Sequence, residues 1–248
     1  MPKFPSPPPV DASPPADEIS PPPVDRGYPW RIGGIAVATA IIYGGVADVI
    51  ARDPVAASIE GGPLENLQVV LALLAATTFA VAAWRTRFGT AALTVCAAAM
   101  AYAAARESDT LFETYLFDDA YKYLVGLPAA AAVALVAWRR RQTLVTETLA
   151  MCRHPAATSA AIAAVYLLFV CQTFDRPMVW DAAGESKAAI KPVVEETAEV
   201  FAYLVIAYSA VESMMMARQS RRSIRGVAGH DGETISRDAP IRGRKRAA

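Results

Sequence analysis

The chain has 248 residues, of which 54% are hydrophobic, and its 24 basic and 24 acidic residues give a formal net charge of zero. Its length would suit one or two soluble domains, but the distribution of its apolar residues excludes them. These residues form six blocks, each near the length of about 20 residues that crosses a membrane. They do not alternate at period two, which argues against a β-barrel. The blocks cover residues 32–49, 67–84, 88–105, 121–138, 156–174 and 193–213.

The blocks predict an all-α fold, a polytopic membrane helix bundle with six transmembrane helices. Although the net charge is zero, the basic residues gather in every second connection, and Trp30, Trp84 and Trp138 each precede an arginine there. Basic residues in short loops face the cytoplasm, and tryptophans mark membrane interfaces. We therefore expect a bacterial-type inner (plasma) membrane protein with both termini in the cytoplasm.

The two ends of the chain differ in composition from its apolar middle. Residues 1–29 are rich in proline and poor in large apolar residues, which predicts a disordered cytoplasmic tail. Residues 217–248 are basic and lack large apolar clusters. They predict a second disordered cytoplasmic tail, attracted to anionic lipid rather than to nucleic acid. Residues 30–216 then form the transmembrane domain.

The first and third blocks are rich in small residues. Glycines and alanines recur through residues 32–49, and a run of alanines fills residues 88–105. Small side chains let membrane helices approach one another closely. We therefore expect these two spans to pack tightly against other helices.

Two connections between blocks carry patterns of their own. In residues 108–119, Leu111, Phe112 and Tyr115 fall at helical spacing. This predicts either a short helix lying on the membrane, a lid over the outer side, or an ordered loop with aromatic anchors. Residues 139–154 are basic and polar and predict a cytoplasmic amphipathic helix.

A repeat is one interpretation of the spacing of charged and aromatic residues. The Trp-Arg pairs that begin at Trp30, Trp84 and Trp138 recur at intervals of 54 residues, and Arg52 and Arg106 are separated by the same interval. Three helical hairpins of like orientation would produce this pattern. Basic inner loops alone would produce it as well, so both interpretations stay open.

The most polar span is the last one, within residues 191–218. Glu195 and Glu199 are four residues apart and share one helix face. At about 1.5 Å of rise per residue, Glu199 lies roughly 9 Å deeper than Val193 and below the headgroups. A carboxylate at that depth requires a partner, a proton or water.

Other predicted spans bring polar side chains to the same outer level. We expect Glu199 to contact Arg106 or Arg176 rather than lipid. The candidate binding cluster near the outer leaflet consists of Glu65, Asn66, Arg106, Glu107, Asp119, Arg176, Glu195 and Glu199.

Three roles for this cluster stay open: a structural ion-pair network, a site for a proton or hydrated cation, or a site that orients a substrate head group. The two histidines, His154 and His230, both fall on the cytoplasmic side, and no metal-ligand spacing occurs. The sequence therefore names no catalytic residue and no metal ligand, and it implies no cofactor.

Three functions follow from these roles. The first is a non-catalytic accessory or scaffold subunit with membrane-protein partners, which should turn small-residue faces outward. The second is a small ion- or solute-handling protein that uses Glu195 and Glu199 along an aqueous path. The third is a lipid-modifying membrane enzyme, which should open laterally near Glu195 and Arg106.

Overall fold

The fold was analysed in a computed structural model, which describes residues 27–59, 61–86 and 88–237. Most of the predicted N-terminal tail (residues 1–26) and the end of the predicted C-terminal tail (residues 238–248) therefore lie outside the described residues. All regular structure in the described ranges is helical. The elements are α1 (Tyr28–Arg52), α2 (Pro54–Ala57), α3 (Pro63–Arg85), α4 (Thr90–Arg106), α5 (Asp109–Tyr115), η2 (Lys122–Gly126), α6 (Leu127–Arg139), α7 (Leu144–Met151), α8 (Pro155–Val165), η3 (Tyr166–Cys171), α9 (Gln172–Asp175), η4 (Pro177–Ser186) and α10 (Lys187–Arg237).

The prediction of an all-α chain is confirmed for the described residues, and the six apolar blocks are helical except for Phe88 and Gly89 at the start of the third. Five segments are long and apolar enough to cross a membrane; they cover Tyr28–Arg52, Pro63–Arg85, Lys122–Arg139, Pro155–Phe174 and Ile190–Gln219. The sixth predicted span corresponds to α4, which has 17 residues. At 1.5 Å per residue α4 is about 25 Å long, somewhat less than the hydrocarbon thickness of a typical bilayer.

Helix boundaries follow local chemistry. Pro29, Pro63 and Pro155 each stand in the first turn of a helix, where a missing N–H costs nothing. The Asp53 carboxylate accepts hydrogen bonds from the backbone N–H groups of Val55 and Ala56, at 3.1 and 2.9 Å, and so caps α2. The connection for which the sequence left a short helix and an ordered loop open contains the helix α5, and the helix predicted in residues 139–154 is present as α7, over Leu144–Met151.

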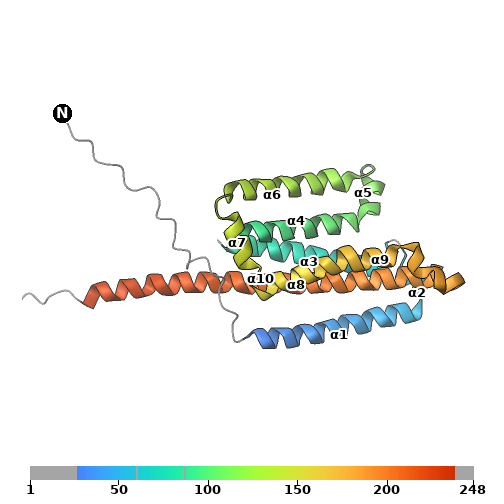
Figure 1. The fold of residues 1–248 in the computed structure, drawn as a ribbon, viewed down its shortest axis with the longest axis horizontal. Coiled ribbons are helices and arrows are strands. Elements are labelled where there is room, and N and C mark those ends of the chain that lie inside the picture. Colours follow the sequence, from blue (N-terminus) through green and yellow to red (C-terminus); the bar gives the residue numbers. More distant parts are fainter. Residues whose placement is uncertain (1–26, 60, 87, 238–248) are drawn as a thin grey trace, which may run out of the picture.

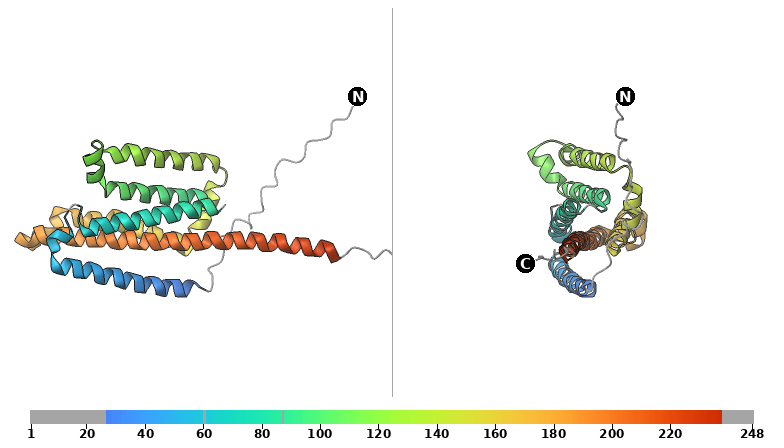
Figure 2. Two further views of the ribbon diagram at one scale, coloured as in Figure 1. Left: turned by 180° about the vertical axis from the view of Figure 1, so that it is seen from behind. Right: turned by 90° about the vertical axis from the view of Figure 1, so that its left-hand side faces the viewer.

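Helix α10 is the central element of the bundle. It packs most extensively against α3 and α8, while α3 packs against α4 and α4 against α6. Seen end on, α6, α4, α3, α10 and α1 follow one another in a curved row, with α7 and α8 to one side (Figure 2). Fully buried alanines lie on the packed faces of α3 and α10, and they permit close helix contact; they include Ala72, Ala75, Ala82 and Ala210.

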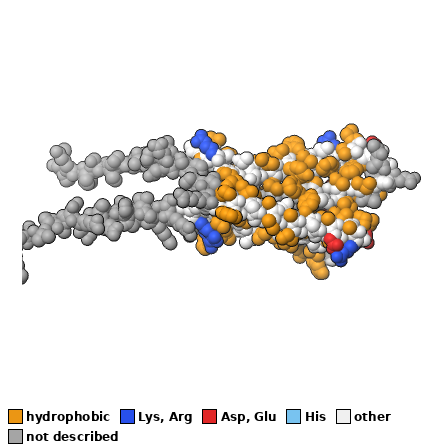
Figure 3. Space-filling model, turned by 90° about the horizontal axis from the view of Figure 1, so that it is seen from below, with side chains coloured by type: hydrophobic (Ala, Val, Ile, Leu, Met, Phe, Trp, Pro, Cys, Tyr) orange, Lys and Arg blue, Asp and Glu red, His pale blue; other side chains and the backbone are white. Residues whose placement is uncertain are grey.

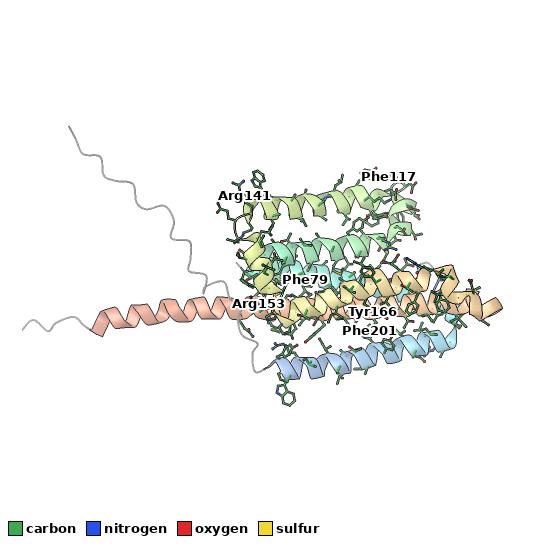
Figure 4. The ribbon with its side chains drawn as sticks, in the orientation of Figure 1. Phe79, Phe117, Arg141, Arg153, Tyr166 and Phe201 are labelled. Carbon is green, nitrogen blue, oxygen red and sulfur yellow. The ribbon has the colours of Figure 1, made fainter. Side chains whose placement is uncertain are left out.

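Helices α1 and α6 lie at the two edges of this row (Figures 1 and 2). Val46 is the one buried residue of α1, and α6 has none. Aromatic side chains fill part of the region between α10 and its neighbours: Phe201 contacts Tyr43 of α1 and Tyr166 of η3, with ring centroids 6.5 and 5.8 Å apart. Tyr166 and Phe201 lie side by side in Figure 4.

Charged side chains gather at the two ends of the bundle and leave an apolar belt between them. The face seen in Figure 3 shows this belt, with basic side chains at one end and both acidic and basic side chains at the other. We name the end at which α1, α4 and α9 finish the carboxylate end, and the opposite end, where α3 and α6 finish, the arginine end.

The turn between α3 and α4 generates a prediction. Gly89 has φ of 65°, and a Cβ atom placed on it would lie 2.5 Å from Sδ of Met151 on α7. Gly61 has φ of 72° but open space around it, so Gly61→Ala is a matched control for the backbone strain alone. That strain costs about 1–2 kcal/mol. We expect both variants to unfold at lower temperature in detergent, with Gly89→Ala lower than Gly61→Ala; equal shifts would show that α7 does not press on this turn.

Candidate functional site

The carboxylate end of α10 is tied to α3 by a buried amide. Gln68 of α3 is fully buried, and its Nε2 donates a hydrogen bond of 2.6 Å to Oε2 of Glu196 and one of 3.2 Å to the backbone oxygen of Glu196. Hydrogen bonds to charged groups are stronger than neutral ones, especially away from water. Gln68 was not among the predicted site residues. Its position in the first turns of an apolar span nevertheless indicates a polar side chain below the membrane surface.

A second link joins α10 to the end of α4. The Tyr203 hydroxyl donates a hydrogen bond of 3.0 Å to Oε1 of Glu107, and Tyr203 is 2% exposed. Burial raises the pKa of the Glu107 carboxyl above its usual range, and the neighbouring Arg106 guanidinium and the Tyr203 hydroxyl only partly oppose that effect. Arg106 also lies within electrostatic range of Glu199.

Four of the predicted site residues are thus gathered near one another at α10: Arg106, Glu107, Glu195 and Glu199. The position of Arg106 agrees with the expected neighbour of Glu199, but the ion pairs seen among the described side chains do not include a direct bridge between these two. Glu195 instead pairs with Lys191, at 3.8 Å, one turn earlier on α10. We call the set Gln68, Arg106, Glu107, Glu195, Glu196, Glu199 and Tyr203 the carboxylate cluster.

The other predicted residues lie at its margin or away from it. Glu65 Oε2 accepts a hydrogen bond of 2.6 Å from the Gly61 N–H, and Asn66 Nδ2 donates one of 2.8 Å to the Gly61 oxygen, so both side chains hold the α2–α3 turn. Glu65 remains within electrostatic range of Glu107 and Glu196. Asp119 pairs with Lys122 at 2.6 Å, and Arg176 is exposed just after α9.

The carboxylate cluster can exchange protons and form hydrogen bonds, but its acids outnumber the bases beside it. Carboxylates crowded in a low-dielectric region disfavour full ionisation together. Among the described residues, no group of three or more His, Cys, Asp or Glu side chains is arranged to hold a metal ion.

A second polar site lies at the arginine end of α10, and the sequence analysis missed it. Arg31 of α1 makes a bidentate ion pair with Glu212 of α10: Nε lies 2.7 Å from Oε1 and Nη2 lies 3.0 Å from Oε2. The Glu212 side chain is 2% exposed and that of Arg31 is 20% exposed. Glu212 is a lone acidic residue at the end of a span with basic flanks. This feature of the sequence could have identified the site.

His154 completes this second site, which we call the Arg31–Glu212 lock. His154 is buried, and its Nδ1 accepts a hydrogen bond of 3.2 Å from the Ala156 N–H, so it caps the start of α8. Burial lowers the pKa of His154, Arg31 lowers it further, and Glu212 opposes both effects. These effects together favour the neutral form of the imidazole beside the ion pair.

Removing the acid of the lock should release α1, because α1 has few other contacts with the bundle. Glu212→Gln removes the charge that pairs with Arg31, and breaking a buried pair costs about 3 kcal/mol. The control is Asp48→Asn, which removes an exposed ion pair with Arg52 on α1 worth about 0–1 kcal/mol. Thermal unfolding in detergent should show a large loss for Glu212→Gln and almost none for Asp48→Asn; equal losses would contradict the role of the lock.

Because His154 caps α8, we expect the arginine end to lose stability as the pH falls. Because the folded-state pKa of His154 lies below its unfolded value of about 6.5, its contribution to stability is present above that pH and is lost as pH falls through the folded pKa. His154→Asn retains a capping acceptor without titrating. We expect the difference in melting temperature between wild type and variant to change between pH 7 and pH 5, with the wild type losing more; a constant difference would refute the assignment.

Comparisons with known proteins give no further guide to this site. No protein-family model matches the chain, and neither a curated protein nor a solved structure matches it. The function of the chain therefore has to be argued from its own geometry.

Proposed function

We propose that the protein is a non-catalytic accessory or scaffold subunit, a multi-pass membrane protein that assembles with another membrane protein through α1. The observation that carries this proposal is the outward face of α1. Its small residues recur at spacings of three and four, which place them on one side of the helix; they are Gly33, Ala36, Ala40, Gly44 and Ala47, all exposed.

The opposite side of α1 faces the bundle. Ile35, Thr39 and Ile42 are half-buried there, and Val46 is buried. A Cβ atom placed on Gly33 or Gly44 would meet nothing within 4 Å. Faces of small residues are the surfaces on which membrane helices approach one another most closely, so this stripe suits a helix of another membrane protein better than it suits the helices of its own bundle.

The carboxylate cluster supports the same proposal because its contacts are internal. Gln68 and Tyr203 satisfy Glu196 and Glu107, and these bonds fix α10 against α3 and α4. Side chains used in this way position the helices rather than carry out a reaction. The second candidate is proton or cation handling, favoured by the excess of carboxylates over the Arg106 guanidinium at this end.

The membrane arrangement follows from the charges. We propose six crossings, with α4 as the sixth, and a bacterial-type inner membrane location in which the arginine end and both termini face the cytoplasm. The basic segment after residue 216 would then meet anionic lipid headgroups. Whether the six helices form three hairpin repeats stays a prediction.

A matched pair of substitutions tests the role of the α1 stripe. Ala40 lies on the stripe, whereas Ala80 is an exposed alanine of α3 outside it. Ala40→Ile adds bulk where close helix approach is proposed, and Ala80→Ile adds the same bulk elsewhere. After extraction in mild detergent and identification of stoichiometric partners by mass spectrometry, Ala40→Ile should reduce the co-purified partner about threefold or more, and Ala80→Ile should not.

The same preparation separates the alternatives. Cross-linking through Ala40→Cys to a second copy of this chain would replace the accessory role with a homo-oligomer. A partner yield that is unaffected by Ala40→Ile, or reduced equally by both isoleucine variants, would contradict the proposal.

A further inference from the structure

An apolar cavity of about 580 Å³ lies at the carboxylate end, beneath the short helix α5. Its walls come from three elements of the bundle and from η2; they include Val69 and Leu73 of α3, Ala101 and Ala104 of α4, and Phe112 and Leu116 of α5 or its end. The size lies within the range of sites that bind small molecules, about 300–1,000 Å³. This cavity shares no lining residue with the carboxylate cluster.

The cavity exists because α4 is built from alanines at this level. Ala101, Ala104 and Ala105 give the helix a shallow surface, and the side chains of α5 cover that surface without filling it. The Ser108 hydroxyl, at the edge, is occupied by a hydrogen bond of 2.9 Å to the Ala104 oxygen. The interior therefore offers apolar contact with little demand for hydrogen bonds, which suits a hydrocarbon chain.

Acidic residues predominate in α5 and directly after it, close in the sequence to residues that line the cavity. Partial desolvation raises the pKa of the exposed Glu113 carboxyl, as does repulsion from Asp118, Asp109 and Asp119. Two basic residues lie near α5 in the sequence: Lys122 pairs with Asp119 at 2.6 Å, and Arg106 lies within electrostatic range of Glu107 and Glu199. The remaining carboxylates leave the rim negative, so it attracts cationic groups and repels anionic ones.

We infer that this cavity is a lipid-binding site selective for a headgroup that carries an ammonium, such as that of phosphatidylethanolamine. One acyl chain would occupy the cavity between α3, α4 and α5, and the ammonium would lie beside the carboxylates of Asp109, Glu113 and Asp118. The inference is independent of the accessory role proposed for α1, because it concerns a different surface of the bundle.

Position and charge together favour a lipid over other occupants. The walls belong to α3 and α4, and the apolar side of α5, with Leu111, Phe112, Tyr115 and Leu116, covers them at the level where headgroups meet acyl chains. Phosphatidylethanolamine and an anionic lipid both carry a phosphate, but only the former has an ammonium that can offset that charge beside the acidic rim.

The test uses the full-length protein in nanodiscs that contain equal amounts of phosphatidylethanolamine and phosphatidylglycerol. After transfer to mild detergent, native mass spectrometry measures the retained lipids. A single charge near a membrane surface changes binding by about fivefold. We therefore expect phosphatidylethanolamine to be retained in preference to phosphatidylglycerol by about fivefold for each rim carboxylate that acts on the headgroup. Equal retention of the two lipids by the wild type, or preference for phosphatidylglycerol, would overturn the inference.

Two variants locate the site. Glu113→Gln combined with Asp118→Asn removes two rim charges and should reduce the preference while lipid remains bound. The control, Asp48→Asn combined with Asp181→Asn, removes the same charge from exposed positions outside the cavity lining and should leave the preference intact. A reduced preference in the control, or an unchanged one in the rim variant, would place the selectivity elsewhere.

Ala101→Phe tests the cavity itself by filling part of it, and its helix content and melting temperature show whether it folds. A folded variant should retain less phosphatidylethanolamine than the wild type. If the variant folds and retains as much, the acyl chain does not lie in this cavity. If Ala101→Phe instead dissociates a second copy of the chain, the occupant is protein and the lipid site is refuted.

Discussion

The packing of the helices depends on how the carboxylates of α10 are stabilised away from water. An ionised carboxylate in a low-dielectric region is several kcal/mol less stable than in water unless it is paired or hydrogen-bonded. Helix α10 meets this constraint at both of its ends within the bundle. Gln68 bonds Glu196 at one end, and Arg31 forms two bonds with Glu212 at the other. Each bond also joins α10 to a different helix, so the constraint on charge becomes a constraint on packing.

The two ends meet this constraint differently. At the arginine end one guanidinium and one carboxylate match in charge and geometry, and the bidentate pair restricts the position of a helix that has little other packing. At the carboxylate end the acids outnumber the bases, and neutral donors such as Gln68 and Tyr203 supply hydrogen bonds without balancing the charge. The arginine end is therefore suited to holding α1, whereas the carboxylate end is the one at which protonation can alter the interactions of α10.

Much of the fold could be predicted from the sequence because apolar length and helix boundaries are local properties. The six blocks and the α7 helix follow from spacing within a few residues, whereas at α5 the spacing left a helix and an ordered loop open. Depth alone placed Glu199 near Arg106 or Arg176, and the structure brings Arg106 within electrostatic range of it. The Arg31–Glu212 lock could not be predicted, because its members are far apart in the sequence and the lateral order of the helices decides which side chains meet. The roles of Glu65 and Asn66 in the α2–α3 turn likewise depend on loop geometry that spacing does not reveal.

A double-mutant cycle on Gln68 and Glu196, followed by unfolding in detergent, tests most directly whether buried polar bonds of α10 hold the bundle together. Gln68→Leu and Glu196→Leu each leave one buried polar partner unsatisfied, whereas the double variant leaves neither. The account predicts that the double variant is less destabilised than the sum of the two single variants, with a coupling of about 1–3 kcal/mol. Additive effects of the two substitutions would contradict it, because they would show that the two side chains do not support one another.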